Sequence, residues 1–341
     1  MPRQAAHREA LRPNQRVRAT RWQALLLMGL AAFPTLSGCS EGAAGSYSVT
    51  FDSLTVEPGT ENTQCVLKRL PTARAMHVNQ IANTLGTGTH HVIIYKTSDS
   101  EEQPTPFDCK PFADLLHPER GVPLMISQKH EDMLKLPAGV GIALESGQMI
   151  RIEMHYINAS TAPVQVTATS TFTEMSADAL KDEADFAFFA NTAIDLPPSS
   201  AASLGPLFLA TPSALDGAKF FGFTGHEHKL GTGVTVAKSS GKDGTDTVVY
   251  DPPNFVWSEP PTVYHDPPIE LPSGGGFRFT CNWQNTTASQ VTFGESANDE
   301  MCVFWSYYYP SKGFFTCAHT DKIAGGLDFC CPGNPICGML P

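Results

Sequence analysis

The stretch RIEMHYIN, Arg151 to Asn158, alternates apolar and polar side chains with the two-residue period of a β-strand. The alternation assigns the side chains to two faces: Ile152, Met154 and Tyr156 on one, and Arg151, Glu153 and His155 on the other. The stretch therefore predicts a strand that packs one face into a core and presents His155 on the other.

The chain around this stretch favours an all-β fold. Glycine and proline are frequent, at 28 and 27 of 341 residues, and short runs of Thr, Val and Phe lie between them. The best helical candidate, Met175 to Ala190, has only a moderate pattern. Once a leader is set aside, roughly 300 residues remain, a length that suggests two domains.

The first 38 residues are predicted to be an export signal. They hold six arginines and one acid, followed by the apolar run Trp22 to Phe33 and by LSGC, Leu36 to Cys39. The apolar run is too short to span a bilayer comfortably. Cys39 resembles the lipidated cysteine of a bacterial lipobox, and Ser40 after it favours outer-membrane sorting. The alternative is an ordinary secretory peptide that is cut nearby.

Charge excludes some partners. The whole chain has a net charge of −11, and removal of the leader leaves 17 Lys and Arg against 33 Asp and Glu, a net charge near −16. Nucleic acid is excluded because its binding requires basic side chains that neutralise phosphates. We expect contact with a membrane only through the N-terminal lipid, and a location in the bacterial cell envelope.

Cysteine content also indicates export. Besides Cys39 there are eight cysteines, an even number that is typical of disulfides in exported proteins. Metal binding by thiolates is the alternative, but the sequence contains no CxxC pair. The tail CCPGNPIC, Cys330 to Cys337, fits a stapled loop.

Histidines gather in a few places. GTHHVIIY, Gly88 to Tyr95, has an adjacent pair, His90 and His91, and FTGHEHKLG has His226 and His228. On a strand, two residues at spacing two leave by the same face and could present two nitrogens to one ion. The HExxH motif of zinc proteases is excluded because position 230 is leucine.

A methionine completes the second set. VTFGESANDEMC, Val291 to Cys302, ends with Met301 beside a cysteine. A lone methionine in a strand is ordinarily core filler. Two imidazoles with a thioether form a soft-leaning donor set that suits copper better than zinc or calcium.

Six segments in this order resemble the copper type II, ascorbate-dependent monooxygenases, the group of peptidylglycine α-hydroxylating monooxygenase and dopamine β-monooxygenase. The similarity covers roughly residues 50 to 312. The segments are VEPGTENTQC, GTHHVIIY, LPAGVGIAL, RIEMHYIN, GHEHKLG and DEMC. Each segment is short, and their shared order carries the resemblance.

The resemblance implies a copper monooxygenase with two coppers per chain. Such an enzyme would hydroxylate a C–H bond with dioxygen and a reductant such as ascorbate, and no catalytic residue is expected beyond the metal ligands. His90, His91 and His155 would form the electron-donating site, and His226, His228 and Met301 the dioxygen-binding site. For both members of the adjacent pair to bind one ion, the strand must bulge, and Gly86 and Gly88 could allow this. The alternative is that only one of the pair is a ligand.

The family fold is two antiparallel jelly-roll β-sandwiches packed side by side. We expect a signal peptide at 1–38, a linker at 39–46, copper domains at 47–183 and 184–312, and a Cys-rich tail at 313–341. The resemblance implies the disulfides Cys65–Cys109 and Cys281–Cys302. The tail cysteines have no partner in the family core, so we expect them to pair among themselves: Cys317, Cys330, Cys331 and Cys337.

The substrate positions depart from the peptide-hydroxylating branch. Thr224, Val303 and Trp305 stand where that branch has the polar groups that hold a peptide carboxylate, and Glu153 replaces a glutamine. A peptide with a C-terminal glycine is therefore disfavoured. The run VFWSYYYP, Val303 to Pro310, hints at an apolar or aromatic small-molecule substrate, although core packing is its more ordinary interpretation.

Two other functions compete with the monooxygenase. A non-catalytic copper-binding envelope lipoprotein would use the same ligands, but a carrier has no need of two dissimilar sites. A jelly-roll adhesin or carbohydrate-binding module would carry the histidines incidentally, and it would not need all six ligands.

Overall fold

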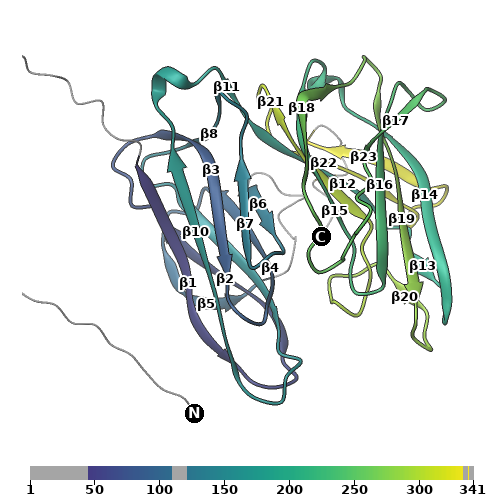
Figure 1. The fold of residues 1–341 in the computed structure, drawn as a ribbon, viewed down its shortest axis with the longest axis horizontal. Coiled ribbons are helices and arrows are strands. Elements are labelled where there is room, and N and C mark those ends of the chain that lie inside the picture. The colour runs from purple at the N-terminus through teal and green to yellow at the C-terminus, as the bar shows by residue number, and fades with distance from the viewer. Residues whose placement is uncertain (1–44, 110–120, 333–336, 338–341) are drawn as a thin grey trace, which may run out of the picture. The chain divides into compact units, whose positions relative to one another are not determined.

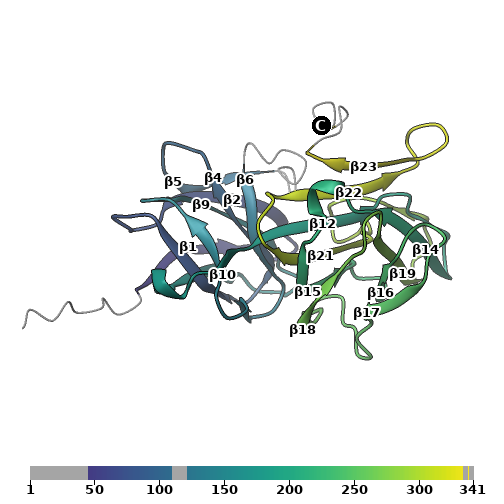
Figure 2. The same ribbon diagram turned by 90° about the horizontal axis from the view of Figure 1, so that it is seen from above.

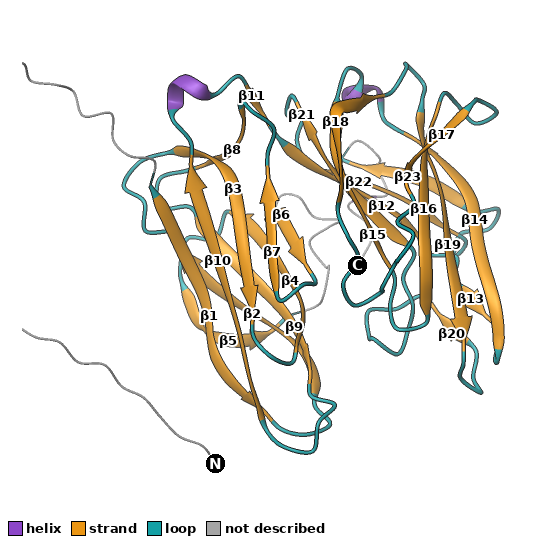
Figure 3. Ribbon diagram, viewed as in Figure 1, coloured by secondary structure: helices purple, strands orange, loops and turns teal. Residues whose placement is uncertain are grey.

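A computed structural model describes residues 45–109, 121–332 and 337. The predicted leader and the lipidation residue Cys39 lie outside the described residues. Within the described part of the chain, no helix is long and apolar enough to cross a membrane. Strands dominate, and the only helices among the described residues are two 3-10 turns, Ala177–Ala179 and Ser213–Leu215 (Figure 3).

The N-terminal half forms two sheets that pack face to face (Figure 1). The outer sheet has the order β1 (Ser46–Val56), β10 (Val164–Glu174), β3 (Met76–Leu85), β8 (Val140–Leu144) and β11 (Asp182–Glu183), and β7 (Glu131–Lys135) also pairs with β3. The inner sheet has the order β5 (Gln103–Asp108), β2 (Glu61–Arg69), β9 (Met149–Ile157), β4 (Thr89–Thr97) and β6 (Gly121–Ser127). We call these two sheets the first sandwich.

The C-terminal half forms the second sandwich (Figure 2). Its inner sheet has the order β18 (Val263–Glu270), β15 (Lys219–His226), β21 (Val303–Tyr309), β12 (Asp185–Asn191), β22 (Phe315–Thr320) and β23 (Leu327–Cys331). Its outer sheet has the order β14 (Ser200–Ala210), β19 (Gly276–Asn285), β16 (Gly231–Ser239) and β17 (Asp246–Tyr250). A small ribbon pairs β13 (Asp195–Leu196) with β20 (Val291–Thr292). The all-β sandwich fold predicted from the sequence is confirmed.

Two apolar cores hold these layers together. Alternate residues of β12 enter different cores: Phe186 and Phe188 join the core of the first sandwich, and Ala187 and Phe189 join that of the second. β21 divides in the same way, with Trp305 in one core and Phe304 in the other. The inner sheet of the second sandwich therefore buries both of its faces, which joins the sandwiches through a continuous apolar layer.

The segment Met175 to Ala190 is not a helix. Only Ala177–Ala179 makes a 3-10 turn, and from Asp185 the chain is the strand β12. The helical expectation is wrong because Phe186 and Phe188 face one core and Phe189 faces the other, which a strand between two cores satisfies.

Four disulfides join cysteines within the described residues. They are Cys65–Cys109, Cys281–Cys302, Cys317–Cys330 and Cys331–Cys337. The four tail cysteines thus pair among themselves, as expected. The tail is also part of the second sandwich, because β22 pairs in parallel with β12 and β23 extends the same sheet.

Candidate metal centres

The first histidine cluster comes from two neighbouring strands of the inner sheet. His91 on β4 lies directly opposite His155 on β9. The register shifts between Thr89 and His91, so His90 is an extra residue in a β-bulge. Gly88 before it has a φ of +84°, a backbone conformation that favours glycine. The bulge predicted for the adjacent pair is confirmed.

The bulge turns all three rings toward one another. Ring centroids are 5.3 Å apart for His90 and His91, 5.2 Å for His90 and His155, and 4.9 Å for His91 and His155. One nitrogen of each ring lies within 4.8 Å of the corresponding nitrogens of the other two. This cluster could hold a metal ion.

The polar atoms of the cluster fit a metal. His155 is 3% exposed, and its Nδ1 has no hydrogen-bond partner within the described structure. Both ring nitrogens of His90 are likewise buried and have no hydrogen-bond partner among the described residues. A buried imidazole nitrogen without a partner is costly in a protein interior, and a bound metal ion removes that cost.

Glu61 orients His155. The Nε2–H of His155 donates to Glu61 Oε1 at 3.0 Å, so Nδ1 is the nitrogen left for a metal. A carboxylate on the outer nitrogen is a common support for a metal-bound histidine. Glu61 also accepts the amide N–H of Ala297 at 3.0 Å, from the loop that leads to Met301. Burial raises the pKa of Glu61, but the bonds from Ala297 and His155 outweigh it and hold that pKa low.

Sequence reasoning missed Glu61 as a functional side chain, although it lies inside the quoted segment VEPGTENTQC. A cavity of about 360 Å³ adjoins it and His155. The cavity is lined by Glu61, Asn62, Thr63, Cys109, His155, Glu295 and Ser296. The cavity therefore reaches the edge of the first cluster at His155.

The second set lies at the end of a strand. His226 is the last residue of β15 and pairs with Val303 on β21, and the strand ends before His228. The expectation that both histidines leave one strand by the same face is therefore wrong for His228. The cause is Glu300, whose carboxylate takes the amide N–H groups of His228 and Leu230 away from strand pairing.

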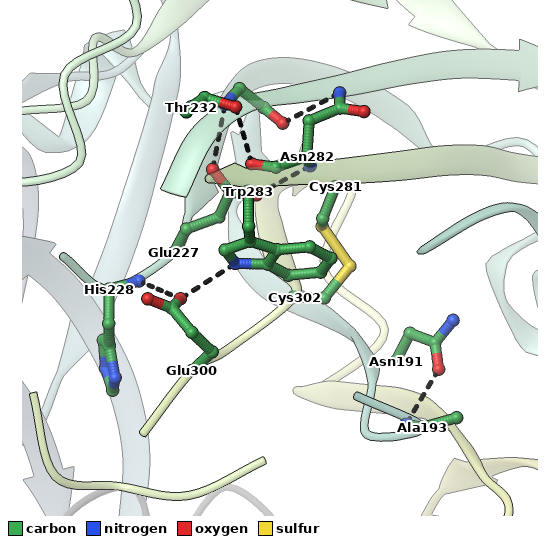
Figure 4. The surroundings of a disulfide bond; sticks show 11 residues. Asn191, Ala193, Glu227, His228, Thr232, Cys281, Asn282, Trp283, Glu300 and Cys302 are labelled. Atoms are coloured by element: carbon green, nitrogen blue, oxygen red, sulfur yellow. Dashed lines mark hydrogen bonds between the residues drawn. A yellow bond between two sulfur atoms is a disulfide. The ribbon is translucent and has the colours of Figure 1, made fainter. Parts of the chain in front are cut away.

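Glu300 is the centre of a buried network (Figure 4). It accepts the amide N–H of His228 at 2.9 Å, that of Leu230 at 2.8 Å, and the indole N–H of Trp283 at 2.9 Å. Burial nevertheless raises the pKa of Glu300. Three donors on one buried carboxylate fix the loop after β15.

Met301 is held from both sides. It follows Glu300 and precedes Cys302, which is bonded to Cys281 on β19. Met301 itself is 3% exposed and belongs to the apolar core of the first sandwich. The backbone on either side of the thioether is thus anchored to the second sandwich, while its side chain packs toward the first.

The histidines of this set have their outer nitrogens bonded. The Nδ1–H of His226 donates to Gln128 Oε1 at 3.1 Å, and the Nδ1–H of His228 donates to the carbonyl oxygen of Asp299 at 3.1 Å. With Nδ1 bonded in this way, Nε2 is the nitrogen of each ring that could bind a metal. The two ring centroids are 5.1 Å apart, and Nε2 of His228 is buried without a partner among the described residues.

Burial favours the neutral form of all five histidines. Burial lowers the pKa of His90 to about 3 and that of His228 to about 4. Burial also lowers the pKa of His91, His155 and His226. Neutral imidazole is the form that binds a metal ion.

The two sets face each other across the sandwich boundary. The ring centroids of His91 and His226 are 6.3 Å apart. Trp257, between β17 and β18, stacks on His90 with its ring centroid 5.2 Å away. The structure thus brings the five predicted histidines into one buried region.

The predicted substrate positions have other partners. The Thr224 hydroxyl bonds to that of Thr262, and Val303 and Trp305 are buried. The aromatic run is divided between the two cores, so its ordinary interpretation holds for most of its side chains. Trp305 also lies 6.3 Å from the ring of His226. Glu153 is buried and accepts the hydroxyl of Tyr95 at 3.2 Å.

Comparison with protein families matches residues 209–324 to the C-terminal domain of the copper type II ascorbate-dependent monooxygenases. This match supports the predicted family for the C-terminal part of the chain. The matched residues contain His226, His228 and Met301, whereas the first cluster lies outside the match. The copper that this family implies fits the residue types described above, which are buried imidazoles and a buried methionine.

Other comparisons add no function. No curated protein matches the chain. Among solved structures, PNGase F, a glycosylasparaginase from Flavobacterium meningosepticum, is 10% identical with a TM-score of 0.35, covering 82% of this chain and 99% of its own. The structure of infectious bursal disease virus Gx strain is 8% identical with a TM-score of 0.17, covering 80% and 79%. Similarity at this level indicates neither a shared fold nor a shared activity.

Proposed function

We propose that this protein is a copper-dependent monooxygenase that hydroxylates a C–H bond with dioxygen and a reductant such as ascorbate. His90, His91 and His155 would hold the electron-donating copper. His226, His228 and Met301 would hold the dioxygen-binding copper. The bound coppers supply one-electron redox chemistry and a place for dioxygen.

The observation that carries the proposal is the support of the ligand rings. The outer nitrogens of His155, His226 and His228 are each bonded to an acceptor of the protein, namely Glu61, Gln128 and the carbonyl of Asp299. Such outer bonds are characteristic of histidines that bind metals. The family match over the second set supplies the choice of copper.

The protein would contribute by orienting the metal ligands and by excluding bulk water. Glu61, Gln128 and the Asp299 carbonyl each hold a protonated outer nitrogen and so aim the other nitrogen inward. Glu300 and the Cys281–Cys302 disulfide anchor the backbone on both sides of Met301. The apolar layer around Trp305 and Met301 keeps bulk water away from the reacting region.

Copper content is the first test. The soluble chain that starts after Cys39, reconstituted with Cu(II) and dialysed, is expected to retain two equivalents of copper by elemental analysis. Retention of none, or a preference for zinc, would refute the proposal.

Dioxygen uptake tests the reaction. The variant His226→Ala is expected to lose ascorbate-dependent dioxygen uptake, because one of the two nitrogen ligands of the second site is removed. His77→Ala is the matched control, since the side chain of His77 bonds to Glu183 on the first sandwich, away from both histidine clusters. Two bound coppers with uptake unchanged in His226→Ala would instead support the non-catalytic copper-binding lipoprotein.

The substrate and location belong to the same proposal. The Thr224–Thr262 bond, and apolar side chains at 303 and 305, support an apolar or aromatic small molecule over a peptide carboxylate. The basic n-region, the apolar run and LSGC support export to the bacterial envelope, with a lipid on Cys39. Mass spectrometry of the membrane-extracted protein tests whether Cys39 carries a lipid. An unmodified N-terminus downstream of Cys39 would exclude it.

A further inference from the structure

Gln128 belongs to the first sandwich but bonds a ligand of the second site. It directly follows β6, whose last residue, Ser127, pairs with Val92 on β4. The ladder that places His91 therefore also places Gln128. The side chain is 7% exposed, and its Oε1 accepts the Nδ1–H of His226 at 3.1 Å.

The orientation of the amide follows from its second bond. The Nε2–H of Gln128 donates to the backbone carbonyl of Trp257 at 3.4 Å. The reversed amide would set oxygen against the Trp257 carbonyl and an N–H group against the N–H of His226. The observed orientation is therefore the one that satisfies both neighbours.

Trp257, whose carbonyl oxygen accepts this bond, also contacts the first site. Its ring stacks on His90 with the planes 30° apart. One amide thus links a ligand of the second set to an aromatic ring that packs on a ligand of the first. Each set is supported in part by the opposite sandwich.

The two histidines of the second set differ in where their support originates. His228 takes its outer acceptor, the carbonyl of Asp299, from its own sandwich. The outer acceptor of His226, Oε1 of Gln128, comes from the first sandwich. If the second sandwich were displaced from the first, His228 would keep its bond to the Asp299 carbonyl, and His226 would lose its bond to Gln128.

We propose that Gln128 is a positioning residue of the second metal site, supplied by the first sandwich, and that it makes copper binding there depend on the docking of the two sandwiches. The inference rests on the proposed function for the identity of the metal. Loss of an outer partner of a metal-bound histidine weakens metal binding by about 10- to 100-fold.

The test uses full-length chains that carry His155→Ala, so that copper binding reports the second site. In this parent, Gln128→Leu removes the acceptor, and Gln128→Glu keeps an acceptor of similar size. Gln148→Leu is the matched control, because Gln148 is a first-sandwich glutamine that bonds backbone carbonyls of Thr97 and Met149 and no histidine. The readouts are the Cu(II) dissociation constant, by competition with a chelator, and the Cu(II) electron paramagnetic resonance spectrum.

We expect Gln128→Leu to bind Cu(II) about 10- to 100-fold more weakly than the parent, with an altered spectrum. Gln128→Glu should lie closer to the parent, and Gln148→Leu should match it. An unchanged dissociation constant and spectrum in Gln128→Leu would overturn the inference, as would equal losses in Gln128→Leu and Gln148→Leu. A parent that binds no copper would refute the proposed function itself, and this inference with it.

Discussion

The two ligand sets are built in different ways. In the first, backbone pairing between β4 and β9 sets the positions of His91 and His155, and a bulge adds His90. In the second, only His226 lies on a strand, and His228 and Met301 lie beyond strand ends. The first set is thus fixed by a sheet, and the second by side chains and a disulfide.

The sandwiches otherwise share a local device. Asn158 after β9 and Asn285 at the end of β19 each accept bonds from the hydroxyl and the N–H two residues later, and donate to nearby carbonyls. Because both halves contain this turn, it does not explain the difference between the sites. The sites differ because the first set lies on paired strands and most of the second set lies in loops. A sheet tolerates the loss of one side chain, whereas a network around one carboxylate does not.

The largest effect is expected from Glu300→Leu. It leaves three buried N–H donors unsatisfied, at about 1–3 kcal/mol for each, so the free energy of unfolding should fall by about 3 kcal/mol or more. Urea denaturation measures the loss. Glu102→Leu is the control, because Glu102 accepts one amide N–H, that of Arg69, at an exposed position. Similar stability of both variants would contradict the account of the second site.

Gly88→Ala should break the first site alone. Gly88 has a φ of +84°, and an added Cβ would lie 3.0 Å from Val164 Cγ2. The left-handed conformation costs about 1–2 kcal/mol for alanine, and relief of the strain would shift the bulge at His90. We expect weaker copper binding at the first site, measured in a His226→Ala background. Gly59→Ala, with a φ of +74° and open space, should show the backbone cost without loss of copper.

Glu61→Leu should have a smaller effect on the same site. His155 would lose its outer acceptor while β9 keeps the ring in place, so copper binding should weaken by about 10-fold. The dissociation constant in a His226→Ala background measures this. Glu57→Leu, an exposed change in the same segment, is the control. Binding as tight as in the parent would show that the sheet alone orients His155.

The smallest effect is expected from Asp185→Asn, because Asp185 supports none of the predicted metal ligands. Asp185 at the start of β12 accepts the hydroxyl of Ser311 and the N–H of Gly313, and burial raises its pKa. Because the folded state then holds the proton more tightly than the unfolded state, the stability from this group decreases as pH rises above the usual carboxyl range. Asp185→Asn should flatten that part of the stability–pH curve. An unchanged slope in urea denaturation would contradict this assignment.

Much of the fold followed from short-range patterns. Period-two alternation and frequent turn residues predicted the all-β sandwiches, and the adjacent histidines after Gly88 predicted the bulge. The same patterns were wrong for Met175 to Ala190 and for the strand position of His228. Local periodicity does not reveal that β12 faces two cores, or that a carboxylate 72 residues away captures the N–H of His228.

The fold class, the histidine pairs and the methionine beside a cysteine could all be predicted from the sequence, because each depends on neighbouring residues. That these six side chains bind copper stays a prediction. The groups that support the rings became visible only in the folded chain. Glu61 is 94 residues from His155, and Gln128 is 98 residues from His226. Such bonds depend on strand register and on the packing of the two sandwiches, and neither has a signal in the spacing of residues along the chain.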